Sequence, residues 1–298
     1  MVDSPILFLV FNRPIETQQV FDKIRSVKPK RLYVSSDGPR NLRNDDLENC
    51  AKVKDIVSKI DWECNVFYNF SDINLGCKSA ISSAIDWFFS NEEQGIILED
   101  DCLPTDFFFK YCDSLLELFK NDENISCING NNFIQEKMVE NEFYLSRYNH
   151  CWGWATWRRA WVDYDKDLSF WPEWKFSENW KCFFTDSNER RYWRKIFDNV
   201  YDSKIDSWAY AWSASIWYKN RLSIMPPINL VKNIGFGENA THTSGSTFDR
   251  YQSIDGEFSL DLNTNLVSDN LDNYLFYKVF FVSFKNKIQY KLNKFQKF

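Results

Sequence analysis

Residues 96–104 run Ile-Ile-Leu-Glu-Asp-Asp-Cys-Leu-Pro, an apolar stretch that ends in three consecutive carboxylates. A continuous apolar run is typical of a strand that is buried on both faces. In an extended chain Glu99 and Asp101 point to one side and Asp100 to the other. Adjacent carboxylates repel one another, and their oxygens suit Mg²⁺ or Mn²⁺ shared with substrate phosphates. The alternative is an acidic loop or helix cap, because Pro104 and Thr105 precede a helical pattern.

Strand-like runs and helical patterns alternate around this stretch. Strands are expected at 6–11, 32–36, 64–68, 96–98 and 125–128, and helices at 15–27, at 44–60, after Gly76 and around 107–118. This alternation predicts an α/β fold with a mostly parallel central sheet covered by helices on both faces. Sites in such sheets lie at the carboxyl ends of the strands. Three polar motifs are therefore expected at one edge: Asn12-Arg13, Ser36-Asp37-Gly38 and Glu99-Asp100-Asp101.

The composition predicts a soluble globular protein in a reducing compartment. The chain has 298 residues, 44% of them apolar and 18% aromatic, with only 9 Gly and 8 Pro, which argues against extended disorder. Its formal charge of −6 argues against a protein that coats nucleic acid. No apolar run approaches the roughly 20 residues of a membrane span, and no secretory signal is evident. Eight scattered cysteines without a C-x-x-C pair disfavour a zinc knuckle and favour the cytoplasm.

Tryptophan is dense between residues 150 and 220. Much of it must be core, but flat apolar faces also suit sugar rings. Trp152, Trp154 and Trp208 are the candidates for such contacts with a sugar. We also expect a single domain over residues 1–270.

Residues 271–298 form a basic C-terminal tail. Six lysines face one aspartate, which makes the segment +5 and the remainder −11, and apolar residues interleave with the lysines at roughly helical spacing. One interpretation is docking to an anionic membrane surface, which would make the protein peripheral on the inner face of the membrane. The other is a helix that packs one face on the domain. The two interpretations have equal weight.

Taken in chain order, these motifs resemble the GT-A-fold glycosyltransferases that use sugar nucleotides. The resemblance is to bacterial family-2-like enzymes and, more distantly, to the eukaryotic N-acetylglucosaminyltransferase that starts complex N-glycan branching. It covers roughly residues 4–245. The motifs are Phe11–Pro14, Ser36–Gly38, Gly76–Lys78, Ile96–Pro104, Trp152–Trp157, Asp206–Trp208, Asn233–Gly237 and Thr241–Thr243.

The resemblance implies roles for the donor-binding residues. Asp101 would bind a divalent metal, Mn²⁺ or Mg²⁺, that bridges the donor diphosphate, while Glu99 and Asp100 would position the sugar or ribose. The other expected donor contacts are Arg13 and Lys78 to the phosphates and Asp37 to the base or ribose. Each of these three also has an ordinary explanation as a surface or loop residue.

Two further roles are expected from the second half. An inverting transfer needs a carboxylate that removes a proton from the acceptor hydroxyl, and Asp206 is the candidate. Aspartate is also a preferred N-cap. Related sequences can carry an acidic residue where this chain has Ala209, which leaves the choice of base open. Spacing alone also leaves a retaining mechanism open. His242, in the polar loop 233–248, would complete the metal shell or contact the diphosphate; the alternative is a loop histidine without that role. His150 is expected to be structural or an acceptor contact.

The function that the resemblance implies is a metal-dependent, inverting glycosyltransferase. It would move a sugar from a nucleotide-diphosphate donor to a saccharide or lipid-linked acceptor in surface glycan synthesis. Its nucleotide-binding half is expected at 1–130 and its acceptor half at 131–270, with Trp152, Trp154 and Trp208 as acceptor contacts. A nucleotidyltransferase that forms sugar nucleotides is an alternative, disfavoured because the loop Asn12-Arg13-Pro14 contains no glycine. A non-catalytic carbohydrate-binding protein is the other alternative.

Overall fold

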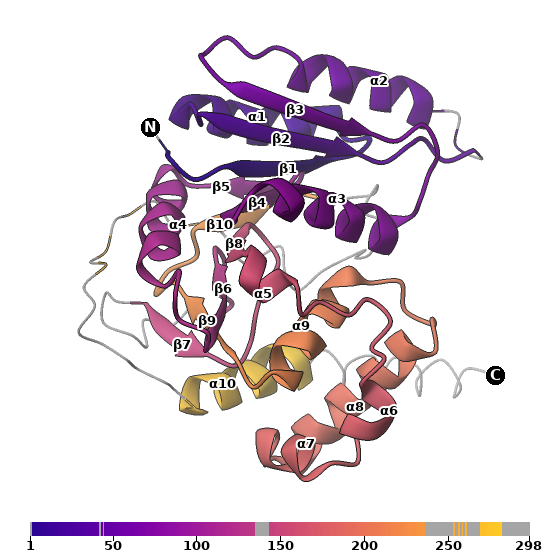
Figure 1. Ribbon diagram of the computed structural model, residues 1–298, viewed down its shortest axis with the longest axis vertical. Helices are drawn as coiled ribbons and strands as arrows, with labels where there is room; N and C mark the ends of the chain where they lie inside the picture. The colour runs from indigo at the N-terminus through magenta and orange to yellow at the C-terminus, as the bar shows by residue number, and fades with distance from the viewer. Residues whose placement is uncertain are drawn as a thin grey trace, which may run out of the picture.

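An eight-stranded sheet forms the centre of the protein in the computed structural model (Figure 1). The structure describes residues 2–41, 43, 45–134, 143–235, 253, 256, 258, 260 and 269–281. The strands are β1 (Ile6–Val10), β2 (Arg31–Ser36), β3 (Asn65–Phe70), β4 (Gln94–Glu99), β5 (Cys102–Pro104), β6 (Ile125–Asn129), β7 (Tyr144–Ser146), β8 (Trp154–Trp157), β9 (Leu222–Met225) and β10 (Val231–Asn233). The helices are α1 (Pro14–Val27), α2 (Asp46–Val57), α3 (Cys77–Asn91), α4 (Asp106–Leu118), α5 (Arg158–Trp161), α6 (Trp171–Trp174), α7 (Glu178–Phe183), α8 (Ser187–Tyr201), α9 (Trp208–Tyr218), α10 (Asp269–Leu275) and the π-helical η1 (Phe276–Phe281).

The sheet order is β3-β2-β1-β4-β8-β6-β9-β7. Strands β3, β2, β1 and β4 run parallel, β8 is antiparallel between β4 and β6, and β7 is antiparallel at the far edge. The chain moves outward from β1 to β3 and then returns to the other side of β1 with β4. This reversal places a topological switch point at the carboxyl ends of β1 and β4, and ligands bind at such points in open α/β sheets.

Helices cover both faces of the sheet because the strands carry apolar side chains on both sides. In β1, Leu7 and Leu9 belong to one buried cluster, which includes side chains of α3 and α9. Ile6, Phe8 and Val10 belong to the other cluster, with side chains of α1, α2 and α4. The alternation follows the two-residue period of a strand. It confirms the predicted α/β class, with a mostly parallel central sheet and helices on both faces.

The nine elements expected before residue 130 are all present, within a few residues of their expected bounds. Several strands were not expected, namely β5, β7, β8, β9 and β10, and β8 is the one that matters most for the sheet. The segment Trp154–Trp157 is β8, the antiparallel strand at the centre of the sheet. All four of its side chains are buried, and the Thr156 hydroxyl donates to the Ser126 carbonyl oxygen at 2.6 Å. The density of tryptophan had directed the interpretation toward sugar-binding faces.

The helices α6, α7 and α8 lie at the bottom of Figure 1, and together with α9, which lies between them and the sheet, they form a lobe. Tryptophan rings fill its interior: Trp171, Trp180 and Trp217 are each at most 2% exposed and pack edge-on against neighbouring aromatic rings. Most of the tryptophan-rich segment is therefore core, as aromatic side chains of this size require.

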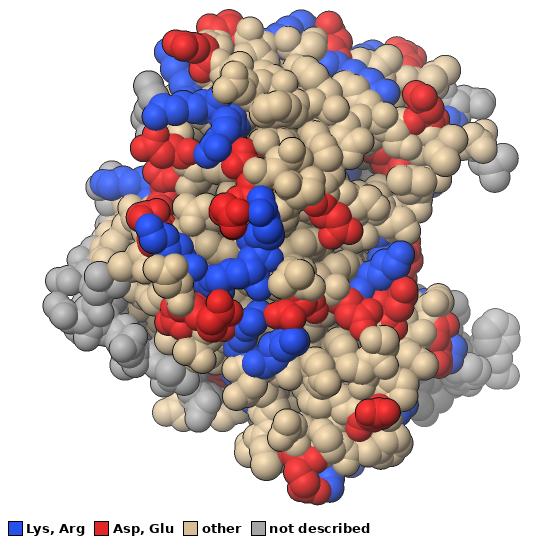
Figure 2. Space-filling view, viewed as in Figure 1, with Lys and Arg blue, Asp and Glu red and all other residues tan. Residues whose placement is uncertain are grey.

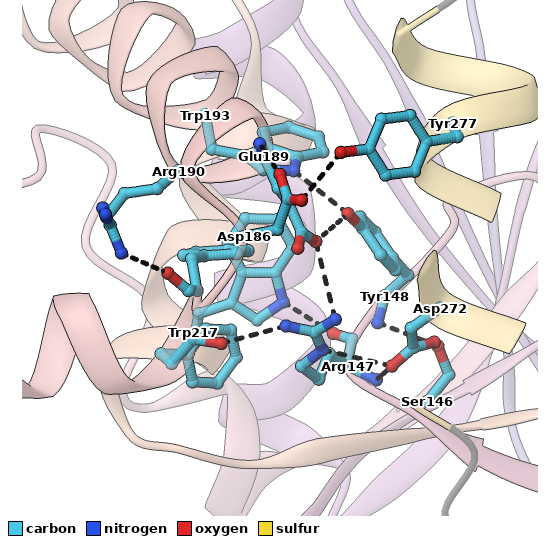
Figure 3. A network of polar contacts seen from close by, with 12 residues as sticks. Ser146, Arg147, Tyr148, Asp186, Glu189, Arg190, Trp193, Trp217, Asp272 and Tyr277 are labelled. Carbon is cyan, nitrogen blue, oxygen red and sulfur yellow. Dashed lines mark hydrogen bonds and ion pairs between the residues drawn. The ribbon is translucent and has the colours of Figure 1, made fainter. Parts of the chain in front are cut away.

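The C-terminal helix is anchored by a buried polar network, shown in Figure 3. Arg147 pairs with Asp272 of α10 at 3.3 Å and with Glu189 of α8 at 3.6 Å. Asp272 also accepts hydrogen bonds from the Ser146 hydroxyl and, at 2.9 Å, from the Arg147 backbone N–H. Residues 271–281 of the expected tail thus pack on the domain, while 282–298 lie outside the described residues. Over the described chain, no helix is both long and apolar enough to cross a membrane.

The face drawn in Figure 2 carries basic and acidic side chains side by side in a band across its middle. Neither sign gathers there into a broad patch. Broad single-sign patches are the usual footprint of polyanion binding, so this face offers none.

Candidate functional site

The loops after β1 and β4 meet at the switch point and bring Arg13 against the acidic motif. The Arg13 Nη1 atom lies 2.6 Å from Asp101 Oδ2 and 3.3 Å from Asp100 Oδ1. The backbone N–H of Phe11 donates to Asp100 Oδ2 at 3.1 Å. Because β1 and β4 are adjacent and parallel, the two sequence motifs reach the same edge.

The charges of this group do not balance, since one guanidinium faces three carboxylates. Burial, followed by repulsion from the neighbouring carboxylates, raises the pKa of both Glu99 and Asp100. Burial would lower the pKa of Arg13, but the attraction of Asp100 and Asp101 outweighs it and the pKa is raised. The excess negative charge favours binding of a further cation.

A third segment lies directly on Asp101. Strand β10 pairs with β5, and the Ile234 N–H donates to the Asp101 carbonyl oxygen at 2.8 Å. At Gly235 a Cβ atom would stand 2.2 Å from Asp101 Oδ2, so this close approach requires glycine. The predicted ligand His242 follows on this segment but lies outside the described residues.

Asp37, expected at the base or ribose, holds a neighbouring loop in this structure. Its Oδ1 accepts hydrogen bonds from the N–H groups of Gly38 at 2.9 Å and Leu75 at 2.8 Å. Its Oδ2 accepts from the Gly76 N–H at 3.1 Å and from the Asn74 amide at 2.9 Å. Burial raises the pKa of Asp37 in spite of these bonds. A contact from Asp37 to a nucleotide stays a prediction, since both carboxylate oxygens already accept hydrogen bonds.

The loop that Asp37 holds through Leu75 and Gly76 leads into α3, and Asp206 lies beside the end of this loop. Gly76 has a φ of 81°, in the region that favours glycine, and its Cβ position lies 3.7 Å from Asp206 Oδ2. Cys77 lies beside the acidic motif as well. Its pKa is raised to about 12, first by burial and then by the nearby carboxylates Glu99, Asp206 and Asp37.

Asp206 is not the cap of α9. The N-cap is Ser207, whose hydroxyl accepts from the Tyr210 N–H at 3.4 Å. The Asp206 side chain is exposed, and its position beside the start of α3 is compatible with the predicted role as a base.

The remaining predicted contacts are less favourably placed. The Lys78 ammonium lies 3.6 Å from Asp167 Oδ1, so its ion-pair partner is not a residue of the acidic motif. Trp154 and Trp208 are 1% and 4% exposed and stack on each other at 5.6 Å. Neither ring has a free face for a sugar, so the expectation for these two is corrected to a core role. Trp152 is partly exposed.

The acidic motif has the donor chemistry of a magnesium or manganese site but does not complete one. Within the described ranges, no group of three or more histidine, cysteine, aspartate and glutamate side chains is arranged to hold a metal. These ions are commonly held by one or two carboxylates together with substrate phosphates and water. The carboxylates of Asp100 and Asp101 fit that mode of binding.

Sequence reasoning missed the polar residues after β6. Asn131 and Asn132 follow that strand on the chain and are buried at 0% and 3% exposure. The rule that selected the loops after β1, β2 and β4 also applies here. The signal was present, since Asn129-Gly130-Asn131-Asn132 is a polar run directly after an apolar strand.

Comparison with known proteins yields no family. No protein-family model matches the sequence, and a search of curated proteins finds no match. Among solved structures, HddC from Yersinia pseudotuberculosis is similar at 12% identity, over 57% of this chain and 86% of that chain, with a TM-score of 0.34. A 4-diphosphocytidyl-2C-methyl-D-erythritol synthase from Anaerococcus prevotii is similar at 13% identity, over 66% and 83%, with a TM-score of 0.37.

Proposed function

We propose that this protein is a metal-dependent glycosyltransferase that uses a nucleotide-diphosphate sugar as donor. The observation that carries the proposal is the group of Arg13, Asp100 and Asp101 at the point where the strand order reverses. That position suits a nucleotide, and the group combines a cation for phosphate with carboxylates for a metal.

Within this proposal, Arg13 exchanges its carboxylate partners for the donor diphosphate, because guanidinium groups bind phosphate oxygens well. Asp101, with Asp100 beside it, would hold Mn²⁺ or Mg²⁺. When bound, such an ion offsets the negative charge that develops on a departing diphosphate. Glu99, on the same loop, would position the sugar or ribose.

Asp206 would remove the proton from the attacking acceptor hydroxyl, as an inverting transfer requires. Three features support this role: the side chain is exposed, it lies near Gly76 at the start of α3, and α9 is capped by Ser207 instead. A saccharide or lipid-linked acceptor, and a place in surface glycan synthesis, belong to the same proposal.

A nucleotidyltransferase that makes sugar nucleotides is the second candidate, because the same switch point suits a nucleoside triphosphate. The loop Phe11–Pro14 argues against it, since it lacks the glycines with which a loop wraps a triphosphate. A carbohydrate-binding protein without catalysis binds neither diphosphate nor metal, and would not need the group of Arg13, Asp100 and Asp101.

One experiment separates the three. Thermal shift with a panel of nucleotide sugars, with and without Mn²⁺, is followed by mass spectrometry of the products. The proposal predicts a metal-dependent rise in Tm with one donor, followed by release of the nucleoside diphosphate. Pyrophosphate made from a nucleoside triphosphate and a sugar phosphate would identify a nucleotidyltransferase. Binding of free glycans with no response to any nucleotide would identify a carbohydrate-binding protein.

A further inference from the structure

Beyond the end of β6, a group of buried polar side chains has no hydrogen-bond partner among the residues that the structure describes. There Asn131 and Asn149 have neither the amide nitrogen nor the amide oxygen paired, and His150 has an unpaired Nε2. These residues are 0%, 8% and 5% exposed. Most buried polar groups in proteins are paired, so three neighbours left unpaired require an explanation.

The three residues lie together on two loops. The Asn129 amide oxygen accepts from the His150 backbone N–H at 2.7 Å, and the Gly130 N–H donates to the Gly153 carbonyl at 2.8 Å. These bonds join the segment after β6 to the segment before β8. The ring of Phe133 contacts the ring of His150 edge-on at 4.5 Å.

The two loops border the acidic site. A Cβ at Gly153 would lie 3.2 Å from a methyl of Leu98, the residue before Glu99. Burial raises the pKa of the Cys151 thiol, and nearby Glu99 raises it further. The polar group and the acidic motif are therefore neighbours on the same edge of the sheet.

We propose that Asn131, Asn149 and His150, together with Trp152, form a subsite that recognises the hydroxyl groups of a pyranose acceptor. The inference rests on the proposed function and adds residues to it. A carboxamide offers a donor and an acceptor to adjacent hydroxyls, which is the pairing that these side chains lack. Trp152 is partly exposed and meets Phe133 at 5.0 Å, so it lies at the border of the group.

The protonation state of His150 suits this role. Burial lowers the pKa of His150 to about 3. Cys127 and Glu99, which raise the pKa of the adjacent Cys151 after burial, are titratable groups near this loop. At neutral pH the imidazole is uncharged, so Nε2 can form a hydrogen bond with a sugar hydroxyl, as acceptor or as donor according to the tautomer.

The first test compares two adjacent asparagines. Asn132 is buried like Asn131, but its amide is paired: its nitrogen donates to the Pro226 carbonyl and its oxygen accepts from the Ile134 N–H, both at 2.8 Å. Asn132→Leu should lower Tm by about 4 °C or more, because it removes the two hydrogen bonds that the Asn132 amide makes. Asn131→Leu should leave Tm unchanged or raise it, because it replaces an unpaired polar group by an apolar one of similar shape. An equal fall in both variants would show that Asn131 is satisfied in the folded protein and would overturn the subsite.

The second test measures binding of methyl glycosides of glucose, galactose, mannose, N-acetylglucosamine and rhamnose by NMR of the histidine ring signals. The chain has two histidines, so His150→Phe assigns the signal and serves as a binding variant. At least one glycoside should shift the His150 signal, and Asn149→Leu should weaken that binding about tenfold or more. No shift with any of the five, or equal binding by Asn149→Leu, would show that these side chains do not bind the sugar and would overturn the proposal.

Nucleoside diphosphate binding with Mn²⁺ is measured on the same samples. Normal nucleotide binding with no glycoside response overturns the subsite and leaves the transferase intact. A glycoside response on His150 without nucleotide binding supports the subsite and counts against the transferase.

Discussion

Asp101 is held from two sides, by the guanidinium of Arg13 and by the backbone at Ile234 and Gly235. Its carboxylate position is therefore determined by packing as well as by charge. This matters for function, since a metal ligand that is displaced by an ångström loses most of its value.

Gly235→Ala should displace the Asp101 carboxylate, because the new Cβ would lie 2.2 Å from Oδ2. We expect a fall of about tenfold or more in metal-dependent nucleotide affinity, measured by titration calorimetry. The control is Gly256→Ala, whose Cβ would lie 3.6 Å from Ile228 in ordinary contact, and which should change nothing. Full affinity in Gly235→Ala would mean that the position of Asp101 is irrelevant.

Asp206→Asn should lower transfer about 10²-fold or more while sparing donor binding and Tm, because it removes only the base. Its control is Ser207→Ala, which removes the helix cap and should cost roughly 0.5–1 kcal/mol of stability with turnover retained. Steady-state kinetics and urea unfolding of both variants provide the measurements. Normal turnover in Asp206→Asn, or a loss of stability there in place of turnover, would return Asp206 to a structural role.

At the scale of the elements, α10 and α8 are joined by a cluster in which Arg147 faces two buried carboxylates, Glu189 and Asp272. One guanidinium cannot neutralise both. Burial, the largest cause, raises the pKa of Asp272 and raises that of Glu189 from 4.5 to about 7.

The folded protein therefore binds a proton at Glu189 more tightly than the unfolded chain does. The stabilisation is complete below about pH 4.5 and is lost as the pH rises through about 7. It corresponds to roughly 3 kcal/mol. Glu189→Gln should flatten this part of the dependence of unfolding free energy on pH, whereas Glu178→Gln, at an exposed position on α7, should not. Parallel pH profiles for wild type and Glu189→Gln would contradict this account.

The elements themselves were largely predictable. The strands and helices up to Asn129 follow the periods of 2 and 3.6 residues, and local pattern decides them. The antiparallel strand β8 was not predicted, because its burial at the centre depends on neighbours that are distant in sequence. The same is true of Trp154 and Trp208, where composition shows large aromatic surface and only packing shows which side it faces.

At the scale of the whole molecule, the fold brings motifs from four parts of the chain to one edge. The acidic motif, Asn12-Arg13 and Ser36-Asp37-Gly38 were expected there, because the carboxyl ends of parallel strands converge. The hydrogen bonds by which Asp37 holds the loop before α3, and the unpaired amides of Asn131 and Asn149, were not predictable. They depend on which backbone groups come within hydrogen-bond distance, and the sequence pattern does not encode those distances.

Membrane docking by the C-terminal tail stays a prediction that rests on residues 282–298, which carry five of the six tail lysines. Deleting them leaves α10 and η1 in place and should weaken binding to phosphatidylserine vesicles about tenfold or more, since each lysine near an anionic surface contributes about 1 kcal/mol. Replacing the five lysines by glutamine should have a similar effect, and phosphatidylcholine vesicles should bind neither protein. Equal vesicle binding by the truncated protein, in a sedimentation assay, would contradict membrane docking.

The central claim is that a carboxylate at the end of β4 binds a nucleotide diphosphate through a divalent ion. The most direct test is calorimetric titration of the nucleoside diphosphate selected by the donor panel, with Mn²⁺ or with a chelator, into wild type and Asp101→Asn. The account predicts at least about tenfold tighter binding with Mn²⁺ in the wild type and no gain from Mn²⁺ in Asp101→Asn. Equal affinities and equal responses to Mn²⁺ in the two proteins would contradict it.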